Sequence, residues 1–262
     1  MVDSVTQTAF KWFQGKRALI TGASSGIGRA IALELGRLGT RIAVHYRGGE
    51  REAHLICEEI EKNGGSAIAL CADLSRSDEV LSIFHRCDQE LGQPLDMLVN
   101  NAGQWMDKSP IRDCPIELWD RMFNINARSV FLCCQQAVQR MAAKKAGAIV
   151  NIGSLAGHTG GGGGTVPYAT AKAAVHTMTR GLAREVASLG IRVNAVAPGM
   201  VDTPMLAGRV SEQAANQLNS AIPLGTFAQP AEIVPAILFL LSPGASYITG
   251  EVIDVNGGLL MR

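Results

Sequence analysis

Tyr168 and Lys172 are the residues of this sequence whose types and spacing point most directly to chemistry. They are four positions apart, so on a helix both side chains lie on one face, about one turn apart. A free tyrosine has a pKa of roughly 10 and is a poor base near neutrality. A neighbouring ammonium group favours the phenolate and lowers that pKa. The pair therefore suggests a tyrosine that transfers a proton, although such spacing also arises by chance.

Three glycines join an apolar strand to a helix near the start of the chain. The run 18–20 is apolar, Gly22, Gly26 and Gly28 follow it, and residues 27–38 carry apolar side chains at helical spacing. Glycine lets a ligand approach the backbone closely, and the free N–H groups of a helix N-terminus attract an anion. The loop is a candidate phosphate site. Its spacing differs from the general dinucleotide motif, so a tight turn that binds nothing is the alternative.

The composition argues against several other classes of function. The chain has 262 residues and a formal net charge of +1, which gives no electrostatic reason to expect nucleic acid or a membrane surface as partner. We find neither a signal peptide nor an apolar run near about 18 residues, and we expect a cytoplasmic protein. The six cysteines are expected to be small buried hydrophobes. The five histidines are scattered without ligand spacing, so no metal site is expected.

Strand and helix patterns alternate along the chain, and the alternation predicts an α/β fold. The expected strands cover 18–20, 41–46, 67–71, 95–99, 148–152, 192–196 and 252–255, and the expected helices 27–38, 50–63, 77–91, 115–143, 168–188 and 230–241. We expect a doubly wound parallel sheet of about seven strands with helices on both faces. One domain over 16–262 should follow a mobile N-terminal tail over 1–15, whose aromatic residues cover the edge of the fold.

Candidate functional residues follow the expected strands. In open parallel sheets ligands bind at the carboxyl ends of the strands. Arg47 follows the second strand, Asp73 the third, residues 100–103 the fourth, Ser154 the fifth and residues 198–199 the sixth. Loops need polar and turn-forming residues in any case. The presence of such residues after the strands is therefore no evidence for a site, and the inference depends on their types.

Taken together, these residues resemble those of the short-chain dehydrogenase/reductase family in its single-domain branch, and the pattern is similar to 3-oxoacyl-carrier-protein reductases. The motifs stand in the family's order: Thr21-Gly22-x-x-x-Gly26-x-Gly28, Asn100-Asn101-Ala102-Gly103, Asn126, Ser154, Tyr168-x-x-x-Lys172 and Pro198-Gly199-x-x-x-Thr203. Each motif alone is a weak indication of the family, whereas the complete set in this order is specific. The resemblance implies a Rossmann-like fold and a hydride transfer between a nicotinamide cofactor and a carbonyl or secondary alcohol.

The resemblance implies four catalytic residues. Tyr168 would be the general acid/base, and Lys172 would lower its pKa and bind the nicotinamide ribose. Ser154 would hydrogen-bond the substrate oxygen, and Asn126 would hold a water that passes protons through Lys172. Two hydroxyls that donate to a developing oxyanion suit this reaction. Taken singly, Ser154 could be a turn residue, and Asn126 could bond backbone inside a helix.

The resemblance also implies the cofactor site. Its residues would be Gly22, Ser24, Ser25, Gly26, Ile27, Gly28, Tyr46, Arg47, Asp73, Leu74, Asn100, Ala102, Gly103, Tyr168, Lys172, Pro198, Gly199, Val201 and Thr203. NAD-preferring enzymes usually carry Asp or Glu at the end of the second strand. Here Tyr46 stands there, and the guanidinium of Arg47 next to it can hold a 2′-phosphate. We expect NADP(H) rather than NAD(H). Arg47 as a surface charge and Asp73 as an Asx turn are the alternatives.

The substrate end is less defined by the sequence. The segment 200–222 is expected to form a lid whose apolar side includes Met205, Leu206, Val210 and Leu218, and it either closes over the site or packs permanently. The glycine run 160–164 should border the cleft, with His158 a solvated loop residue. Sugar, steroid and quinone reductases of the same branch share these motifs, and no distinctive carrier-protein docking patch is found.

The expected assembly is a homotetramer, with a small-molecule substrate as the other partner. In the family the helices matching 115–143 and 168–188 form subunit contacts, and residues 259–261 would add to another interface; the alternative is that these helices pack only within the monomer. The rival function is an NADP(H)-binding regulator or scaffold without turnover, which would not need Ser154, Tyr168 and Lys172 together. A nucleic-acid binder is disfavoured by the near-zero charge.

Overall fold

The chain folds around a parallel β-sheet, as its alternating pattern predicts. The structure is a computed structural model that describes residues 11–92, 94–207, 209 and 212–262. Its strands are β1 (Arg17–Ile20), β2 (Arg41–Tyr46), β3 (Ser66–Cys71), β4 (Met97–Asn100), β5 (Gly147–Ile152), β6 (Ile191–Pro198) and β7 (Val252–Val255). All neighbours pair in parallel in the order β3-β2-β1-β4-β5-β6-β7. The predicted single-domain, doubly wound fold is confirmed.

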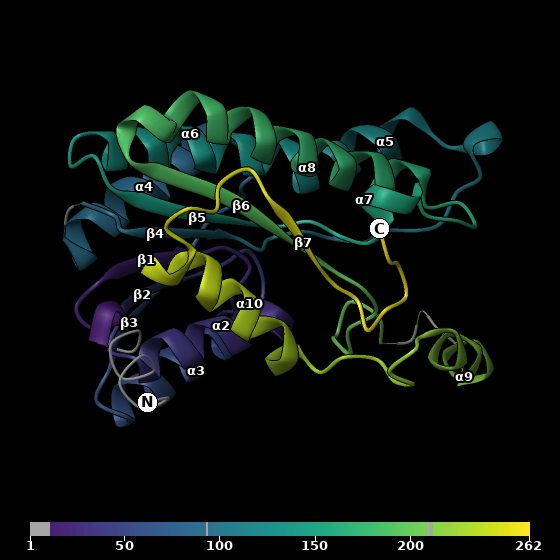
Figure 1. Ribbon diagram of the computed structural model, residues 1–262, viewed down its shortest axis with the longest axis horizontal. Coiled ribbons are helices and arrows are strands. Elements are labelled where there is room, and N and C mark those ends of the chain that lie inside the picture. Colours follow the sequence, from purple (N-terminus) through teal and green to yellow (C-terminus); the bar gives the residue numbers. More distant parts are fainter. Residues whose placement is uncertain (1–10, 93, 208, 210–211) are drawn as a thin grey trace.

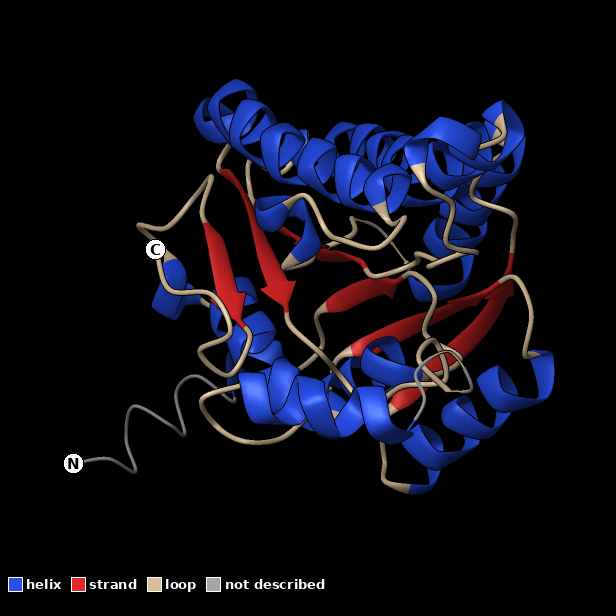
Figure 2. Ribbon diagram, turned by 90° about the vertical axis from the view of Figure 1, so that its right-hand side faces the viewer, coloured by secondary structure: helices blue, strands red, loops and turns tan. Residues whose placement is uncertain are grey.

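Helices cover both faces of this sheet. They are α2 (Gly26–Arg37), α3 (Glu50–Lys62), α4 (Ser77–Leu91), α5 (Ile116–Phe123), α6 (Ser129–Ala142), α7 (Ala156–Thr159), α8 (Val166–Val186), α9 (Glu212–Ala221) and α10 (Pro230–Leu241). Figure 1 shows α4, α5, α6 and α8 on one side of the sheet and α2, α3 and α10 on the other. Figure 2 shows the strands enclosed between the two layers.

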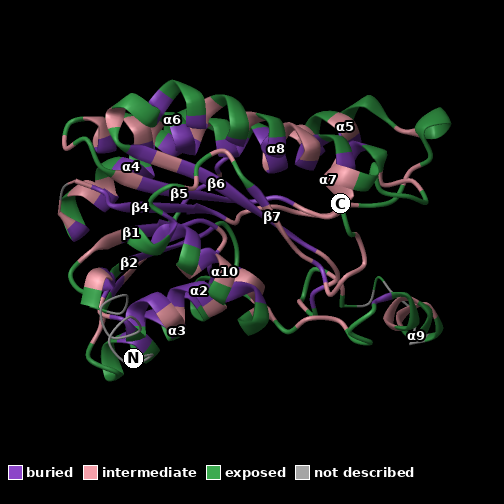
Figure 3. Ribbon diagram, viewed as in Figure 1, coloured by how far each residue is buried: buried purple, intermediate pink, exposed green. Residues whose placement is uncertain are grey.

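Apolar strand residues divide between two cores because successive side chains point to opposite faces. In β1, Leu19 belongs to the core that includes Phe84 of α4, whereas Ile20 belongs to the core that includes Ile31 of α2, and all four are fully buried. Figure 3 shows the same burial along the central strands. A continuous apolar run is what a strand covered on both faces requires.

The strand order reverses on either side of β1, and this reversal positions the site. β1 pairs with β2 on one edge and with β4 on the other. The chain leaves β1 toward one helical layer and leaves β4 toward the other, so the loops after these strands separate. A crevice is therefore expected at the carboxyl ends of β1 and β4.

Some local expectations were wrong. A π-helical turn (Asn124–Arg128) interrupts the helix predicted over 115–143 and separates α5 from α6. Cys71, which ends the edge strand β3, is exposed and Cys114 is partly exposed, while the other four cysteines are buried. Phe13 of the expected tail packs on the fold, as its aromatic residues were expected to do: it is 3% exposed, and its carbonyl accepts a hydrogen bond from Thr40 Oγ1. Phe10 lies outside the described residues.

The described helices include none that is both long and apolar enough to cross a bilayer.

Candidate active site

A cavity of about 680 Å³ opens at the carboxyl edge of the sheet and collects most of the predicted site residues. Those that line it are Gly22, Ser24, Ser25, Gly26, Ile27, Arg47, Asp73, Leu74, Ala102, Gly103, Ser154, Tyr168, Lys172, Pro198, Gly199, Val201 and Thr203. Gly28, Tyr46, Asn100 and Asn126 are outside the lining. Segments that are far apart in the sequence therefore meet at one cavity.

The glycine loop between β1 and α2 presents backbone N–H groups to this cavity. Gly22 and Gly26 have φ of +61° and +54°, a region that glycine adopts without steric cost. Ser25 precedes α2 and makes no side-chain cap hydrogen bond, so the first N–H groups of the helix are available to a ligand. A Cβ on Gly28 would lie 2.5 Å from Asn101 Nδ2. Gly28 therefore allows close packing of the start of α2 against Asn101.

Asn101 fastens the glycine loop to the loop after β4. Its Nδ2 donates to the carbonyl oxygens of Thr21 and Gly22, each at 2.9 Å. Thr21 Oγ1 accepts from the backbone N–H groups of Asn101 and Ala102, also at 2.9 Å. Asn100, which the sequence assigned to cofactor binding, is buried and donates from Nδ2 to Asn151 Oδ1 at 2.9 Å. It joins β4 to β5.

His45 is a site residue that the sequence reasoning missed. Its Nδ1 accepts from Gly22 N–H at 2.9 Å, and its Nε2 lies 3.0 Å from the carbonyl oxygen of Ala72. This pattern requires the neutral ring with its proton on Nε2. Burial lowers the pKa of His45 to about 4, so the ring stays neutral near pH 7. A histidine inside an apolar strand was the available signal.

Arg47 and Asp73 line the cavity near the glycine loop, whereas Tyr46 does not. Arg47 is exposed. Asp73 Oδ1 accepts from both the backbone N–H and the hydroxyl of Ser75, at 2.9 and 2.7 Å, so it forms an Asx turn as well. Burial would raise the pKa of Asp73, but the Ser75 hydrogen bonds and the charge of Arg47 bring it below the ordinary value. Tyr46 is 7% exposed, and its hydroxyl donates to Glu50 Oε1 at 3.4 Å.

Tyr168 and Lys172 lie on α8 and line the same cavity. Lys172 is 4% exposed, its Nζ donates to the carbonyl oxygen of Ile152 at 2.8 Å, and burial lowers its pKa to about 8. Burial raises the pKa of Tyr168, and a hydrogen bond with Ser154 opposes this rise. The predicted lowering by the lysine is not found. Lys172 Nζ is 5.9 Å from the centre of the tyrosine ring, and desolvation of the phenol outweighs it.

Ser154 follows β5 and lies beside Tyr168. Its Oγ accepts from Ala156 N–H at 3.1 Å, so it shapes the turn and also lines the cavity. A serine hydroxyl keeps its own proton to donate while it accepts. Both hydroxyls can therefore donate to one oxygen placed between them.

Asn126 occupies the π-helical turn and bonds backbone, as one of the alternatives expected. Its Oδ1 accepts from Gln104 N–H at 3.0 Å, and its Nδ2 donates to the carbonyl oxygens of Gln104 and Met122 at 2.9 Å each. A Cβ on Gly103 would lie 2.8 Å from Asn126 Oδ1 and 3.3 Å from Lys172 Nζ. The amide and the amine thus approach the same glycine.

Several residues that line the cavity were missed. They are Gln104, Trp105, Leu155, Thr159, Thr165 and Pro204. Met205 and Leu206, which were expected on the apolar side of the lid, line the cavity as well. Arg209 Nη1 donates to the carbonyl oxygen of Trp105 at 2.5 Å, which joins the lid segment to the loop after β4. Thr159 and Thr165 flank the glycine run, whose own residues do not line the cavity. Val210 lies outside the described residues.

His158 is not the solvated loop residue that the sequence suggested. It lies in α7 with a side chain only 10% exposed, and its Nε2 is 3.2 Å from Asp254 Oδ1. Its ring packs on that of His176. The partner carboxylate is almost 100 positions away, so local spacing gave no sign of it.

Among the described residues, no group of three or more His, Cys, Asp or Glu side chains is arranged to hold a metal ion.

The chain matches a family model described as Enoyl-(Acyl carrier protein) reductase over residues 22–260. It is 41% identical to the 3-oxoacyl-[acyl-carrier-protein] reductase FabG of Staphylococcus aureus, over 94% of this chain and 98% of that protein. A solved short-chain type dehydrogenase/reductase from Mycobacterium marinum has a TM-score of 0.91 and 34% identity, over 98% of this chain and 99% of that one. NADH-dependent reductase A1-R′, responsible for alginate metabolism, has a TM-score of 0.88 and 31% identity, over 96% and 100%.

The family model covers most of the chain, the relatives exceed 30% identity over nearly its whole length, and the expected fold is present. The chain belongs to the short-chain dehydrogenase/reductase family, and it is an NAD(P)-dependent oxidoreductase that transfers a hydride between a nicotinamide cofactor and its substrate.

Proposed function

We propose that this enzyme uses NADPH to reduce a ketone carbonyl, with a 3-oxoacyl thioester as the substrate class. One observation carries the proposal: a single cavity is lined both by the glycine loop and Arg47 and by Ser154, Tyr168 and Lys172. Paired hydroxyls suit a carbonyl oxygen, which gains negative charge when its carbon accepts a hydride. The 41% identity to a 3-oxoacyl thioester reductase supports the substrate class.

The residues around the glycine loop fit a dinucleotide with a 2′-phosphate. Uncapped N–H groups at the start of α2 suit a pyrophosphate. Arg47 lines the cavity beside Ser24 and Gly48. No carboxylate stands at Tyr46, where one would repel the 2′-phosphate. The positive charge of Arg47, with no carboxylate at position 46, supports NADP(H) over NAD(H).

Proton transfer falls to Tyr168, with Ser154 and Lys172 as its partners. The bound nicotinamide supplies the hydride. Ser154 and Tyr168 donate hydrogen bonds to the substrate oxygen, and Tyr168 releases its proton to that oxygen. Lys172, whose pKa is about 8, is mostly protonated at pH 7 and stabilises the phenolate that remains. Its ammonium group also binds the ribose.

Asn126 helps to return a proton to Tyr168. Its Oδ1 accepts one hydrogen bond, from Gln104 N–H, and a carbonyl oxygen has a second lone pair. That lone pair can hold a water near Lys172, because both side chains approach Gly103. Protons would then reach Tyr168 from the solvent through this water and the amine.

We also propose a homotetramer. Large apolar side chains are exposed on several elements. Ile116 of α5 and Phe131 of α6 are 63% and 51% exposed, Phe239 of α10 is 43% exposed, and Met261 is 76% exposed. Exposed apolar side chains on separate elements suit contacts between subunits, and two different interfaces per subunit would build a tetramer.

The test is initial-rate oxidation of NADPH and NADH with 3-oxoacyl thioesters, quinones, keto sugars and simple diketones. We expect the thioesters to give the highest kcat/KM and NADPH to exceed NADH at least tenfold. A higher efficiency with NADH would refute the cofactor preference. Turnover of another carbonyl class alone would refute the thioester assignment, and no turnover with any carbonyl would refute the reductase function.

A further inference from the structure

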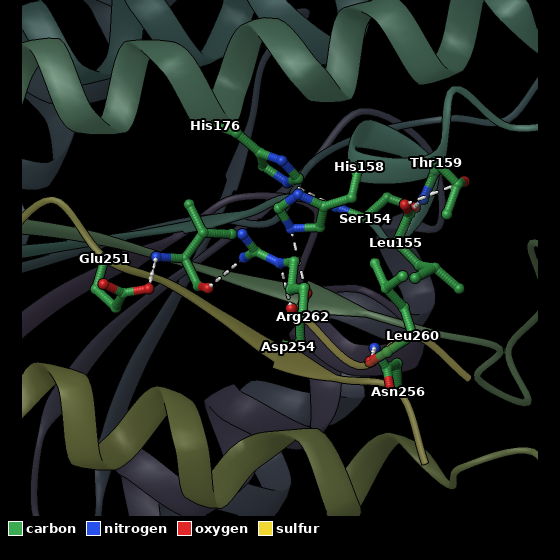
Figure 4. A network of polar contacts seen from close by, with 12 residues as sticks. Ser154, Leu155, His158, Thr159, His176, Glu251, Asp254, Asn256, Leu260 and Arg262 are labelled. Carbon is green, nitrogen blue, oxygen red and sulfur yellow. Dashed lines mark hydrogen bonds and ion pairs between the residues drawn. The ribbon is translucent and has the colours of Figure 1, made fainter. Parts of the chain in front are cut away.

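His176 lies directly beneath the backbone of residues 153–157, which we call the serine segment because it carries Ser154. His176 is 2% exposed, and its Nε2 accepts a hydrogen bond of 3.4 Å from Ser154 N–H. A Cβ on Gly153 would overlap this ring, and one on Gly157 would lie 2.7 Å from its Cε1. The two glycines make room for an imidazole against the serine segment. Figure 4 shows His176 beside Ser154.

Three further side chains continue from His176 toward the last residue of the sequence. His158 packs on His176 with ring centroids 4.3 Å apart and planes tilted by 35°. Its Nε2 is 3.2 Å from Asp254 Oδ1, and Asp254 Oδ2 accepts from Arg262 Nε at 2.7 Å. We call these four side chains the His–Asp–Arg chain. Figure 4 shows them leading from β7 to the serine segment.

His176 Nδ1 is a buried polar atom without a hydrogen-bond partner. Because Nε2 of the neutral His176 accepts a hydrogen bond, its proton must be on Nδ1. His158 Nε2 and Asp254 Oδ1 are also buried, but they lie 3.2 Å from each other and form a pair. A buried N–H group without a partner is destabilising, and an apolar side chain at this position would avoid that cost.

We propose that Asp254 and Arg262 hold His158 against His176, and that the two histidines thereby position Ser154 for its hydrogen bond to the substrate oxygen. This inference rests on the proposed function, which gives Ser154 that role. None of the four residues lines the cavity, whereas Arg47 and the glycine loop do. They are positioning residues, so their loss should lower kcat while the KM for NADPH stays unchanged.

The charges around the histidine pair give this role a distinctive pH dependence. Burial lowers the pKa of His158; the charge of Asp254 opposes this, and Arg262 and Arg180 reinforce it. Burial brings the pKa of His176 to about 4, and the neighbouring charges act in the same direction, from His158, Arg180, Lys172 and Arg262. Protonation of His176 removes the acceptor at Nε2, and protonation of His158 disturbs the stacked pair. In both cases the serine segment loses its support, and kcat should fall at acid pH.

Substitutions of Asp254 and of Arg262 should shift the acid limb, the pH range over which kcat falls, in opposite directions. Asp254→Asn removes a charge that raises the pKa of His158, so kcat should persist to lower pH. Arg262→Gln removes a charge that lowers this pKa, so kcat should fall at higher pH than in the parent. A general loss of rigidity would act the same way in both variants. Arg86→Gln, which changes an exposed ion pair on α4, is the matched control and should leave the profile unchanged.

The experiment measures kcat and KM for NADPH and a 3-oxoacyl thioester between pH 4 and 8. His176→Leu should lower kcat tenfold or more, with the KM for NADPH within twofold. His176→Gln, whose amide oxygen can accept from Ser154 N–H, should recover part of that loss. NADPH binding, followed by fluorescence, checks that each variant is folded. A kcat of His176→Leu within twofold of the parent would overturn the inference, as would acid limbs that move in the same direction in Asp254→Asn and Arg262→Gln.

A second readout does not depend on turnover. Histidine ¹⁵N resonances of the NADPH complex should show His176 protonated on Nδ1 at pH 7. The pKa of His158 should fall in Asp254→Asn and rise in Arg262→Gln. If these shifts occur in a protein that reduces no carbonyl, the proposed function is refuted and the inference about the His–Asp–Arg chain is supported. If the shifts are absent, that inference is refuted, whatever the activity.

Discussion

The chemistry of this site depends on groups that are withdrawn from water. Lys172 is almost fully buried, with its amine against the carbonyl oxygen of Ile152, and its pKa is lowered to about 8. Burial also raises the pKa of Tyr168, which keeps the phenol protonated and ready to donate. Each residue is therefore suited to reduction at neutral pH at some cost in stability.

Lys172→Met should stabilise the fold at pH 7 while it removes activity. The folded pKa of about 8 is below the unfolded value of about 10.4. Between these values the unfolded chain binds a proton that the folded chain does not. The cost of the buried amine is therefore absent above pH 10.4 and complete below pH 8, at most about 3 kcal/mol.

Denaturant unfolding of Lys172→Met at pH 7, 8.5 and 10 measures this cost. The gain in the free energy of unfolding should be largest at pH 7 and smallest at pH 10. Lys62→Met, at the exposed end of α3, is the control and should show little pH dependence. An effect of Lys172→Met that is the same at all three pH values contradicts this account of its burial.

Arg47→Asp should reverse the choice of cofactor. Loss of a charge-assisted contact should lower kcat/KM for NADPH by about 10- to 100-fold, and the new carboxylate can accept from the ribose hydroxyls of NADH. Arg51→Asp makes the same change of charge on α3, outside the cavity lining, and controls for long-range electrostatics. If both variants keep the preference of the parent, Arg47 is only a surface charge.

At the scale of elements, the loops after β1, β3 and β4 form one unit. Asn101 ties the loop after β4 to the glycine loop, and His45 ties the glycine loop to the residue after β3. Three strand ends are therefore held together before a cofactor binds. Such preorganisation reduces the cost of binding.

His45→Val should weaken the binding of NADPH about tenfold and change acid stability in a specific way. The pKa of His45 is about 4 in the folded chain and about 6.5 when unfolded. Stability is therefore lost as pH falls from 6.5 to 4, by up to about 3 kcal/mol. The variant lacks this titration, so its unfolding free energy should fall less over the same range. His85→Val on the exposed face of α4 should match the parent, and an unchanged slope in His45→Val would contradict the assignment.

The parts of the site that the sequence could predict are those defined by local spacing. The three glycines between an apolar run and a helix can be recognised from spacing alone, and so can Tyr168 and Lys172 on one helical face. Neither feature requires knowledge of distant contacts. His45 and Gln104 were missed because their hydrogen-bond partners belong to other segments. The π-helical turn has no glycine or proline to mark it, so nothing in the pattern separated α5 from α6.

At the scale of the whole molecule, the strand alternation was enough to predict the sheet and its helical layers. Burial was harder to predict, because it depends on how the elements pack. The apolar faces of 115–143 and 168–188 are partly core: Val130, Ala137 and Ala183 are buried within the monomer. Only the packed structure separates these residues from exposed ones such as Phe131.

Sedimentation velocity at micromolar concentration should show a tetramer of this chain. The expectation rests on the exposed apolar side chains of α5, α6 and α10, which a stable assembly would cover. Phe131→Lys should shift the distribution toward smaller species while the fold is kept. A parent protein that sediments as a monomer would refute the assembly.

The most direct test of the account is hydride transfer by Tyr168→Phe. This variant keeps the ring and removes the one proton that the mechanism donates. With NADPH and the best substrate of the parent, kcat should fall about 10²- to 10⁴-fold, while the dissociation constant for NADPH stays within a few fold. Tyr247→Phe, at a fully exposed tyrosine, should behave like the parent. A Tyr168→Phe enzyme with near-normal kcat would contradict the central claim that this phenol is the acid of the reaction.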